Sequence, residues 1–238
     1  MKQQLNRLFI CEKISKNRLK LKYNKPSKPI IIDKRKMFNE DYARIAGMMP
    51  DGSLIKDLKR IYFHQKKYKK MVYTFAKLLK NLFSPESTIL FKYGSRGDKQ
   101  CYINSQTLAI YFYNIIKIPK SDEQMRIPKW IFKAKKSIKI AYLQMAFDME
   151  GTVLKKLTEI RFGTKDGKFA LDLKKLLSQI EIKSSLTFAP RLKQKSGQHR
   201  ISIYSKENFK KFKEIGFRIP FLKNRFNNLV KKYKLTED

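Results

Sequence analysis

The sequence is poor in acidic residues and in cysteine, and each shortage excludes a class of protein. Asp and Glu together number 20 against 55 Lys and Arg, which gives a formal net charge of +35 in 238 residues. Such an excess destabilises a compact fold by self-repulsion unless a polyanion neutralises it, and nucleic acid is the obvious polyanion. The two cysteines, Cys11 and Cys101, form neither a zinc-ligand cluster nor a disulfide framework. We therefore expect a nucleic-acid partner and a reducing, cytoplasmic setting.

Long apolar runs are also missing. No stretch approaches the ~18 apolar residues that a membrane-spanning helix requires, and the start, Met1-Lys2-Gln3-Gln4, has no signal-peptide pattern. An anionic membrane is the other polyanion that so basic a chain could meet, but we expect no membrane partner. The hydrophobic content of 42% suffices for a proper core in one large or two small domains.

An internal repeat organises the chain, and a repeat is interpreted before single motifs. Residues 43–54 read ARIAGMMPDGSL and residues 141–153 read AYLQMAFDMEGTV. Both are apolar, small-residue helix patterns that end in a carboxylate directly before a glycine and then pass into a strand-like pattern. Further matches follow in the same order, about 100 residues apart: Phe63 and Phe162, Gln65-Lys66 and Thr164-Lys165, the helix patterns 75–79 and 169–177, and Ile118-Pro119 and Ile219-Pro220.

Each half is predicted to read helix, hairpin, helix, hairpin, helix. In the first half, Asn39 or Asp41 caps the motif helix and Gly52 ends it as a C-terminal glycine. The patterns there predict strands at 53–56, 59–63, 89–93 and 100–103, and helices at 69–83 and 106–116. The patterns of the second half predict strands near 152–156, 159–164, 186–191 and 199–204, and a helix at 206–215. The predicted boundaries are a basic N-terminal extension at 1–38, a first repeat at 39–118, a linker at 119–138, a second repeat at 139–220 and a basic C-terminal helix at 221–238.

The N-terminal extension allows two interpretations. Its dense run of lysines suits either a solvated leader or an arm that lies on a phosphate backbone.

Alternation in the second predicted strand separates two faces of a sheet. Ile61 and Phe63 fall on one face, whereas Arg60, Tyr62 and His64 fall on the other. A sheet with one face packed on helices and the other face basic is what a duplex-binding saddle requires. With the hairpin turns and the matching positions of the other strands, the predicted DNA contacts are Lys56, Arg60, Tyr62, His64, Lys92, Arg96, Lys99, Tyr102, Arg161, Arg191, Lys193, Lys195 and Arg200.

The motif copies at residues 46–52 and 145–151 resemble those of the LAGLIDADG family of homing endonucleases, in its single-chain, two-repeat form of the archaeal intron-encoded type. The resemblance covers roughly residues 40–220. It implies an α+β fold of two pseudo-symmetric αββαββα repeats, with antiparallel sheets forming a DNA-binding saddle and the motif helices at the interface. It also implies a monomer on double-stranded DNA that needs no protein partner. Pro50 and Met145 stand where the family usually has small residues.

The resemblance also implies a metal site. Divalent cations held by carboxylates neutralise a phosphate, activate water and stabilise the leaving oxygen, and Mg²⁺ favours one or two carboxylates plus water and phosphate oxygens. A carboxylate at a helix C-terminus is disfavoured by up to ~1 kcal/mol, a penalty that a bound cation removes. The expected cofactor is Mg²⁺ or Mn²⁺, and the predicted metal-site residues are Asp51, Glu150, Gly52 and Gly151.

Polar residues after the second strand of each half complete the predicted catalytic set. By resemblance, Gln65 and Thr164 orient water, while Lys66 and Lys165 stabilise phosphate charge, so the catalytic residues are these four with Asp51 and Glu150. A plain alternative stays open for each residue, because acids at helix ends and polar residues at strand ends are common in a lysine-rich chain. Asp148 is interpreted as a neighbour of the ligand Glu150, and His64 and His199 as surface contacts.

The leading interpretation is a metal-dependent, site-specific DNA endonuclease that makes a double-strand break in a long asymmetric target. The alternatives are an intron RNA-splicing maturase, a catalytically silent DNA-binding protein of the same fold, and a purely electrostatic coating protein. The ordered repeat and the 13% aromatic content argue against the last.

Overall fold

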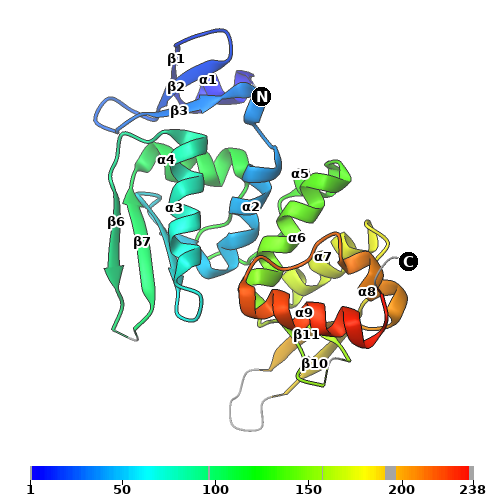
Figure 1. Cartoon of the computed structure of the whole chain (residues 1–238). Coiled ribbons are helices and arrows are strands. Elements are labelled where there is room, and N and C mark those ends of the chain that lie inside the picture. Colours follow the sequence, from blue (N-terminus) through cyan, green and yellow to red (C-terminus); the bar gives the residue numbers. More distant parts are fainter. Residues whose placement is uncertain (1, 96, 157, 191–196, 236–238) are drawn as a thin grey trace. The chain divides into compact units, whose positions relative to one another are not determined.

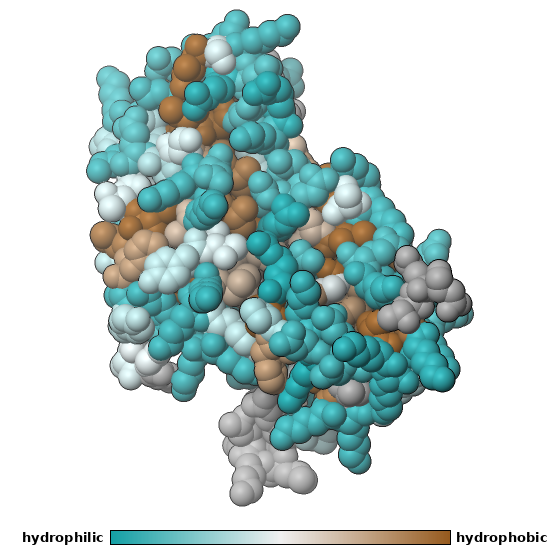
Figure 2. All heavy atoms as spheres, viewed as in Figure 1, coloured by the Kyte–Doolittle hydropathy of each residue, from teal (hydrophilic) through white to brown (hydrophobic). Residues whose placement is uncertain are grey.

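The chain forms two compact units, Met1–Glu123 and Gln124–Asp238. The computed structural model describes residues 2–95, 97–156, 158–190 and 197–235. Each unit contains a four-stranded antiparallel sheet with helices on one face (Figure 1). Among the described residues, no helix combines the length and the apolar character needed to cross a membrane. Hydrophilic side chains cover most of the surface visible in Figure 2.

The sheet of the first unit follows the motif helix directly. Its strand order is β4-β5-β7-β6, and helix α3 covers one of its faces, with Phe75 of the helix stacked on Phe63 of the sheet at 4.6 Å between ring centroids. The elements are α2 (Glu40–Met48), β4 (Gly52–Leu54), β5 (Arg60–Gln65), α3 (Lys70–Phe83), β6 (Ile89–Tyr93), β7 (Lys99–Asn104), α4 (Gln106–Tyr111) and a π-helical turn (Phe112–Ile116).

The second unit repeats this arrangement, with the strand order β10-β11-β9-β8. Gly52 pairs with Phe63 in the first sheet, and Gly151 pairs with Phe162 in the second, so the two hairpins have the same register. The predicted repeat and the α+β fold are thereby confirmed. The elements are α5 (Lys129–Lys133), α6 (Lys136–Glu150), β8 (Gly151–Val153), β9 (Ile160–Thr164), α7 (Gly167–Ser178), β10 (Ser185–Ala189), β11 (Gln198–Ile203), α8 (Lys206–Phe212) and α9 (Pro220–Lys232).

The end of the first motif helix differs from the prediction. Asn39 caps α2 as expected, because its side chain accepts hydrogen bonds from the backbone N–H groups of Asp41 and Tyr42. Gly52 caps the final 3-10 turn, where its N–H donates to the Met49 carbonyl, but its φ of −112° and ψ of 172° are extended rather than left-handed, and it opens β4. The α-helix already ends at Met48 and continues as a single 3-10 turn, since Pro50 has no N–H to continue the helical ladder.

Clusters of buried aromatic rings fix each motif helix in its unit. In the first unit, Tyr42 of α2 meets Phe83 of α3 at 5.3 Å, and its hydroxyl lies 3.2 Å from that of Tyr111. In the second unit, Phe147 of α6 meets Phe162 of β9 at 5.4 Å and Phe212 of α8 at 5.1 Å. Large rings dominate core energetics because each removes so much apolar area from water. Each motif helix is therefore anchored in the aromatic core of its own unit.

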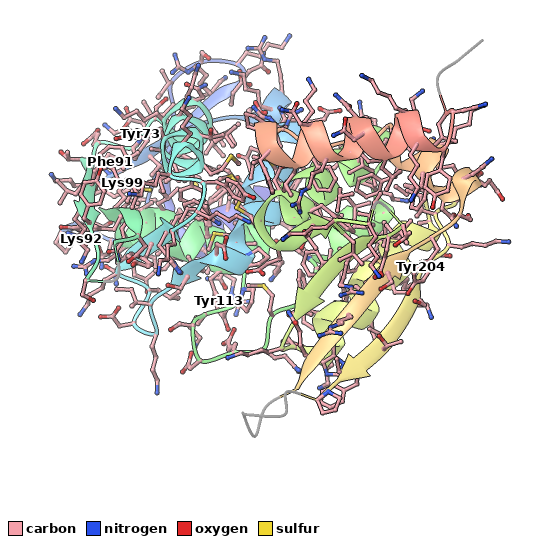
Figure 3. All side chains as sticks on the ribbon, turned by 60° about the horizontal axis from the view of Figure 1, so that its bottom comes forward. Tyr73, Phe91, Lys92, Lys99, Tyr113 and Tyr204 are labelled. Carbon is pink, nitrogen blue, oxygen red and sulfur yellow. The ribbon has the colours of Figure 1, made fainter. Side chains whose placement is uncertain are left out.

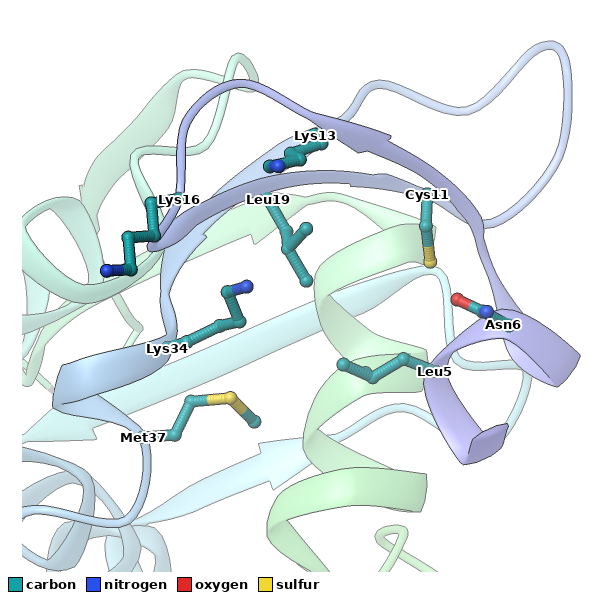
Figure 4. Close-up of a pocket in the computed structure, with 8 residues that line it drawn as sticks. All are labelled: Leu5, Asn6, Cys11, Lys13, Lys16, Leu19, Lys34 and Met37. Atoms are coloured by element: carbon teal, nitrogen blue, oxygen red, sulfur yellow. The ribbon is translucent and has the colours of Figure 1, made fainter. Parts of the chain in front are cut away.

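The N-terminal residues fold into a small sheet of their own. Helix α1 (Lys2–Leu8) precedes three antiparallel strands in the order β1-β2-β3, at Ile10–Lys13, Arg18–Lys22 and Ile30–Asp33. Leu21, Ile30 and Ile32 are fully buried, so the interpretation as a solvated leader is wrong, while contact with a phosphate backbone stays a prediction. A cavity of about 460 Å³ lies here (Figure 4), and its lining includes Leu5, Leu19, Met37, Lys13, Lys16 and Lys34.

Candidate nucleic-acid interface and acidic sites

The register of the first sheet divides its side chains between two faces. Tyr62 pairs with Tyr102, and successive residues of a strand point to opposite faces. Phe63 lies on the face covered by α3, so Tyr62 lies on the other. We call this other face the first open face, and its basic and aromatic members are Arg60, Tyr62, His64, Lys92 and Tyr102. Five of the predicted DNA contacts therefore share one surface.

Aromatic rings hold the cations of the first open face in place. The Arg60 guanidinium lies 4.8 Å from the centroid of the Tyr102 ring, and its Nε donates a hydrogen bond of 2.6 Å to Asn104. Lys92 Nζ lies 5.4 Å from the same ring. Tyr62 and His64 stack at 5.6 Å. A cation over an aromatic face is stabilised by the ring quadrupole, so this surface presents ordered positive charge.

The open face of the second sheet contains a buried carboxylate that sequence analysis missed. Glu159 is only 5% exposed, and both of its oxygens accept 2.8 Å hydrogen bonds from Arg161. The Ser202 hydroxyl also donates to Glu159. Burial acts to raise the pKa of Glu159, but the hydrogen bonds from Arg161 and Ser202 outweigh it and lower the pKa. The available signal was spacing, since Glu159 and Arg161 are two residues apart and share a strand face.

The first motif acid is tied to the end of β5. Asp51 ends the 3-10 turn, is half-buried, and accepts a hydrogen bond from the Gln65 side-chain amide. Gln65 is 7% exposed, and its Oε1 accepts 3.3 Å hydrogen bonds from the backbone N–H groups of Lys67 and Tyr68. Gln65 therefore connects the acid to the turn that leads into α3. The structure brings these two predicted catalytic residues into contact.

The second motif acid has a different setting. Glu150 is the last residue of α6 and is exposed. Thr164 is in the position equivalent to Gln65, and its hydroxyl accepts a 3.2 Å hydrogen bond from the backbone N–H of Asp166. Asp166 in turn caps α7. Gln65 and Thr164 thus stabilise the same kind of turn, and each is followed by an exposed lysine, Lys66 or Lys165.

Asp148 serves the structure of the second unit. It is fully buried and accepts hydrogen bonds from the backbone N–H groups of Arg218, at 3.0 Å, and Ile219, at 3.4 Å. Burial is the main cause that raises its pKa to about 6. These contacts connect α6 to the residues directly before α9. The expectation that Asp148 is only a neighbour of the motif acid is consistent with this position.

Other predicted DNA contacts lie elsewhere. Lys56 forms an ion pair of 3.6 Å with Asp122. Lys99 lies on the helix-covered side of the first sheet, because it pairs with Gln65, two residues from Phe63. Arg200 pairs with Gly163, on the same face of the second sheet as Arg161. Four predicted contacts lie outside the described residues: Arg96, Arg191, Lys193 and Lys195.

The described residues contain no group of three or more His, Cys, Asp or Glu side chains placed so that they could hold a metal ion. A magnesium site needs fewer, since one or two carboxylates suffice when water and phosphate oxygens complete the shell. Asp51 and Glu150 fit this low demand, because each lies at a helix end with part of its surface accessible. Gly52 and Gly151 follow them as the first residues of β4 and β8.

Comparison with known proteins identifies the fold. Residues 137–216 match the family described as LAGLIDADG-like domain. The structure of I-DmoI in complex with DNA and Ca shares 15% sequence identity at a TM-score of 0.57, over 79% of this chain and 97% of that one. The homing endonuclease I-WcaI, bound to its DNA recognition sequence, shares 14% identity at a TM-score of 0.53, over 79% of this chain and 85% of that one. The chain therefore has the LAGLIDADG homing-endonuclease fold, as its motif copies predicted.

Two further relatives extend the comparison. Full-length DUF199/WhiA from Thermatoga maritima shares 12% identity at a TM-score of 0.54, over 84% of this chain and 62% of that one. A probable translation initiation factor IF-2 from Methanocaldococcus jannaschii is 26% identical over 132 residues, which are 52% of this chain. The match spans only 11% of the length of that factor. The similarity therefore concerns one segment of that factor.

Proposed function

We propose that this protein is a site-specific endonuclease that makes a double-strand break in a long asymmetric DNA target by metal-dependent hydrolysis. The duplicated acid is the observation that carries the proposal. Asp51 and Glu150 each end a motif helix, and each directly precedes the strand that opens a sheet with a basic face. The structural relative I-DmoI is described as a homing endonuclease and has been studied with DNA in the presence of Mn, Ca and Mg.

Duplex DNA is the proposed partner. The net charge of +35 supplies strong attraction to phosphates, which dominate the affinity of such complexes. The ordered cations Arg60 and Lys92 of the first open face, and Arg161 of the second, are presented by strands rather than by loops. Strands that hold their side chains in place favour reading of base edges in a groove.

The proposed chemistry divides between the two halves. Asp51 and Glu150 would hold Mg²⁺ or Mn²⁺, which supplies charge neutralisation at the phosphate and lowers the pKa of bound water when present. Gln65 fixes the orientation of Asp51 through its amide, and its own position is fixed by two backbone N–H groups. The exposed Lys66 and Lys165 place positive charge after each strand, where it can offset charge developing on the phosphate.

The two halves offer different surfaces to DNA. Arg60 lies on the first open face, whereas the equivalent residue of the second half, Glu159, is buried and hydrogen-bonded to Arg161; Arg161 itself is equivalent to Tyr62. A DNA-binding protein with two-fold symmetry prefers a palindromic site, so two unequal halves favour an asymmetric target. A single chain carries both acids, and we therefore propose that it acts as a monomer.

A binding protein of the same fold is the second candidate. The fold is shared with DUF199/WhiA. A maturase that holds intron RNA, or a silent DNA-binding protein, would retain the basic surfaces without using the acids. A randomised DNA library incubated with and without Mg²⁺ separates the candidates. Discrete double-strand breaks that require Mg²⁺ support the endonuclease, whereas selective binding without breaks supports the binding protein.

A further inference from the structure

A group of exposed aromatic rings gathers at the outer strand of the first sheet. Tyr73 of α3 is 52% exposed, Phe91 of β6 is 43% exposed and Tyr93 of β6 is 63% exposed. Lys99 of the neighbouring strand β7 lies among them. We call these four residues the edge patch, and Figure 3 labels three of them together on the first unit. Rings of this size are normally withdrawn from water, so a cluster of exposed ones indicates an interaction site.

The edge patch is ordered by contacts among its own members. Tyr73 and Phe91 stack at 5.2 Å with an interplanar angle of 29°. Lys99 Nζ lies 4.4 Å from the centroid of the Tyr93 ring and 5.3 Å from that of Tyr73. Lys69 approaches Tyr93 from the start of α3, at 5.3 Å. Hydrogen bonding to Tyr73 is the main cause that raises the pKa of Lys99, so the ammonium group stays charged.

The first open face does not account for the edge patch. Phe91, Tyr93 and Lys99 alternate with Lys92 and Tyr102, so they project from the opposite, helix-covered side of the sheet. Among the described residues of the second unit, the exposed phenylalanine or tyrosine at the matching place is Phe188 of β10, which is 58% exposed and lies 5.0 Å from His199. The edge patch is therefore a feature of the first half and is separate from the proposed duplex surface.

We propose that the edge patch binds unpaired nucleotides of a single-stranded nucleic acid. Bases stack on exposed aromatic side chains regardless of sequence, and neighbouring cations neutralise the phosphates between them. The exposed rings of Tyr73, Phe91 and Tyr93 supply the stacking surface, and Lys69 and Lys99 supply the charge. Charge complementarity selects this occupant, because a second copy of a chain with net charge +35 would be repelled. The proposal does not depend on cleavage.

Affinity for strands with and without bases tests the proposal. Fluorescence anisotropy compares a labelled oligothymidylate with an abasic strand of the same length, which has the same phosphates and no rings. The wild type should bind the oligothymidylate at least about tenfold more tightly than the abasic strand. The combined variant Tyr73→Ala, Phe91→Ala and Tyr93→Ala should lose this preference and keep its affinity for duplex DNA. An oligouridylate of the same length shows whether RNA or DNA is the better ligand.

Matched variants separate stacking from other effects. The double variant Tyr73→Phe with Tyr93→Phe keeps the rings and should keep the preference for the oligothymidylate. Leu171→Ala removes an exposed apolar residue from the second unit and should leave that preference unchanged. Equal wild-type affinity for the two strands, or an unchanged preference in the triple alanine variant, would overturn the proposal. Efficient displacement of the oligothymidylate by polyglutamate would do so as well, since it would indicate an acidic protein partner. Duplex cleavage, measured in parallel, reports separately on the endonuclease proposal.

Discussion

The two motif copies place their acids at equivalent positions although their backbones differ at the end of the helix. In the first, the α-helix ends at Met48 and a 3-10 turn containing Pro50 leads to Asp51. In the second, α6 runs without interruption to Glu150. The glycine after each acid nevertheless pairs with the matching phenylalanine of the next strand, Phe63 or Phe162. Strand pairing, rather than the geometry of the helix end, therefore fixes where each acid emerges.

The surroundings of the two acids also differ. Asp51 is the last residue of the 3-10 turn and is held by the side-chain amide of Gln65, whose Oε1 accepts a hydrogen bond from the Lys67 backbone N–H. Glu150 is exposed, and the Thr164 hydroxyl at the position equivalent to Gln65 bonds to the backbone of Asp166. Position 148 is a buried Asp in one copy, where Met49 stands in the other. The repeat thus preserves the positions of the acids while their support has diverged.

Removal of either acid should have the largest effect. Asp51→Asn and Glu150→Gln should abolish cleavage of the corresponding DNA strand in Mg²⁺, because each removes a charged ligand while keeping the size of the side chain. Duplex affinity should change little, since it comes mainly from Lys and Arg. Strand-resolved cleavage of a labelled target and anisotropy titrations measure the two quantities. Wild-type cutting by either variant would show that its acid is not a metal ligand.

Proline should be tolerated in one motif helix and not in the other. Met149→Pro should lower the free energy of unfolding by about 3 kcal/mol or more, because it removes a helical hydrogen bond and its ring clashes with the preceding turn. The matched change Pro50→Ala should alter stability by no more than about 1 kcal/mol, because the chain there is already a 3-10 turn. Urea unfolding followed by circular dichroism measures both. Similar losses in the two variants would contradict the difference between the copies.

Asp148 should make stability depend on pH. Its pKa is raised from 3.8 to about 6 in the folded protein, so folding favours the protonated form. Its contribution is fully present below about pH 4 and is lost as pH rises through about 6, a decrease of about 3 kcal/mol. Asp148→Asn keeps an oxygen acceptor for Arg218 and Ile219 and should remove that decrease. Urea midpoints of wild type and variant between these pH values should diverge; parallel curves would exclude the assignment.

Gln65 should matter more for cleavage than its counterpart. Gln65→Ala removes the amide that orients Asp51 and should slow cutting of one strand by about tenfold, the worth of a hydrogen bond to a charged group. Thr164→Ala should slow cutting of the other strand less, because the Thr164 hydroxyl accepts its hydrogen bond from the backbone of its own turn. Accumulation of nicked plasmid during a time course reveals unequal strand rates. Equal effects of the two variants would mean that the Asp51 contact does not position the acid for reaction.

Local patterns predicted most of the repeat. Alternation placed Arg60, Tyr62 and His64 on one face, and helical spacing predicted 69–83 where α3 runs from Lys70 to Phe83. The resemblance of the motif copies gave the fold. These features could be predicted because period and register depend on residues close together in the chain.

Features that depend on distant contacts escaped prediction. The strands β1 and β2 are short and contain basic residues beside apolar ones, and the burial of Leu21 requires the rest of the unit. The contact of Gln65 with Asp51 joins residues 14 positions apart, and the burial of Glu159 depends on Arg161 and on Ser202 of another strand. The early end of α2 is a local effect of Pro50, but it was not predicted because the helix was expected to run as far as Gly52.

The central claim is that one chain with two unequal halves cuts one asymmetric duplex site. Light scattering after size-exclusion chromatography of the complex, combined with mapping of both strand breaks in Mg²⁺, tests it most directly. One protein per duplex and one break on each strand of a non-palindromic site are the predicted results. Two proteins per duplex, or a perfect palindrome as the preferred target, would contradict the claim.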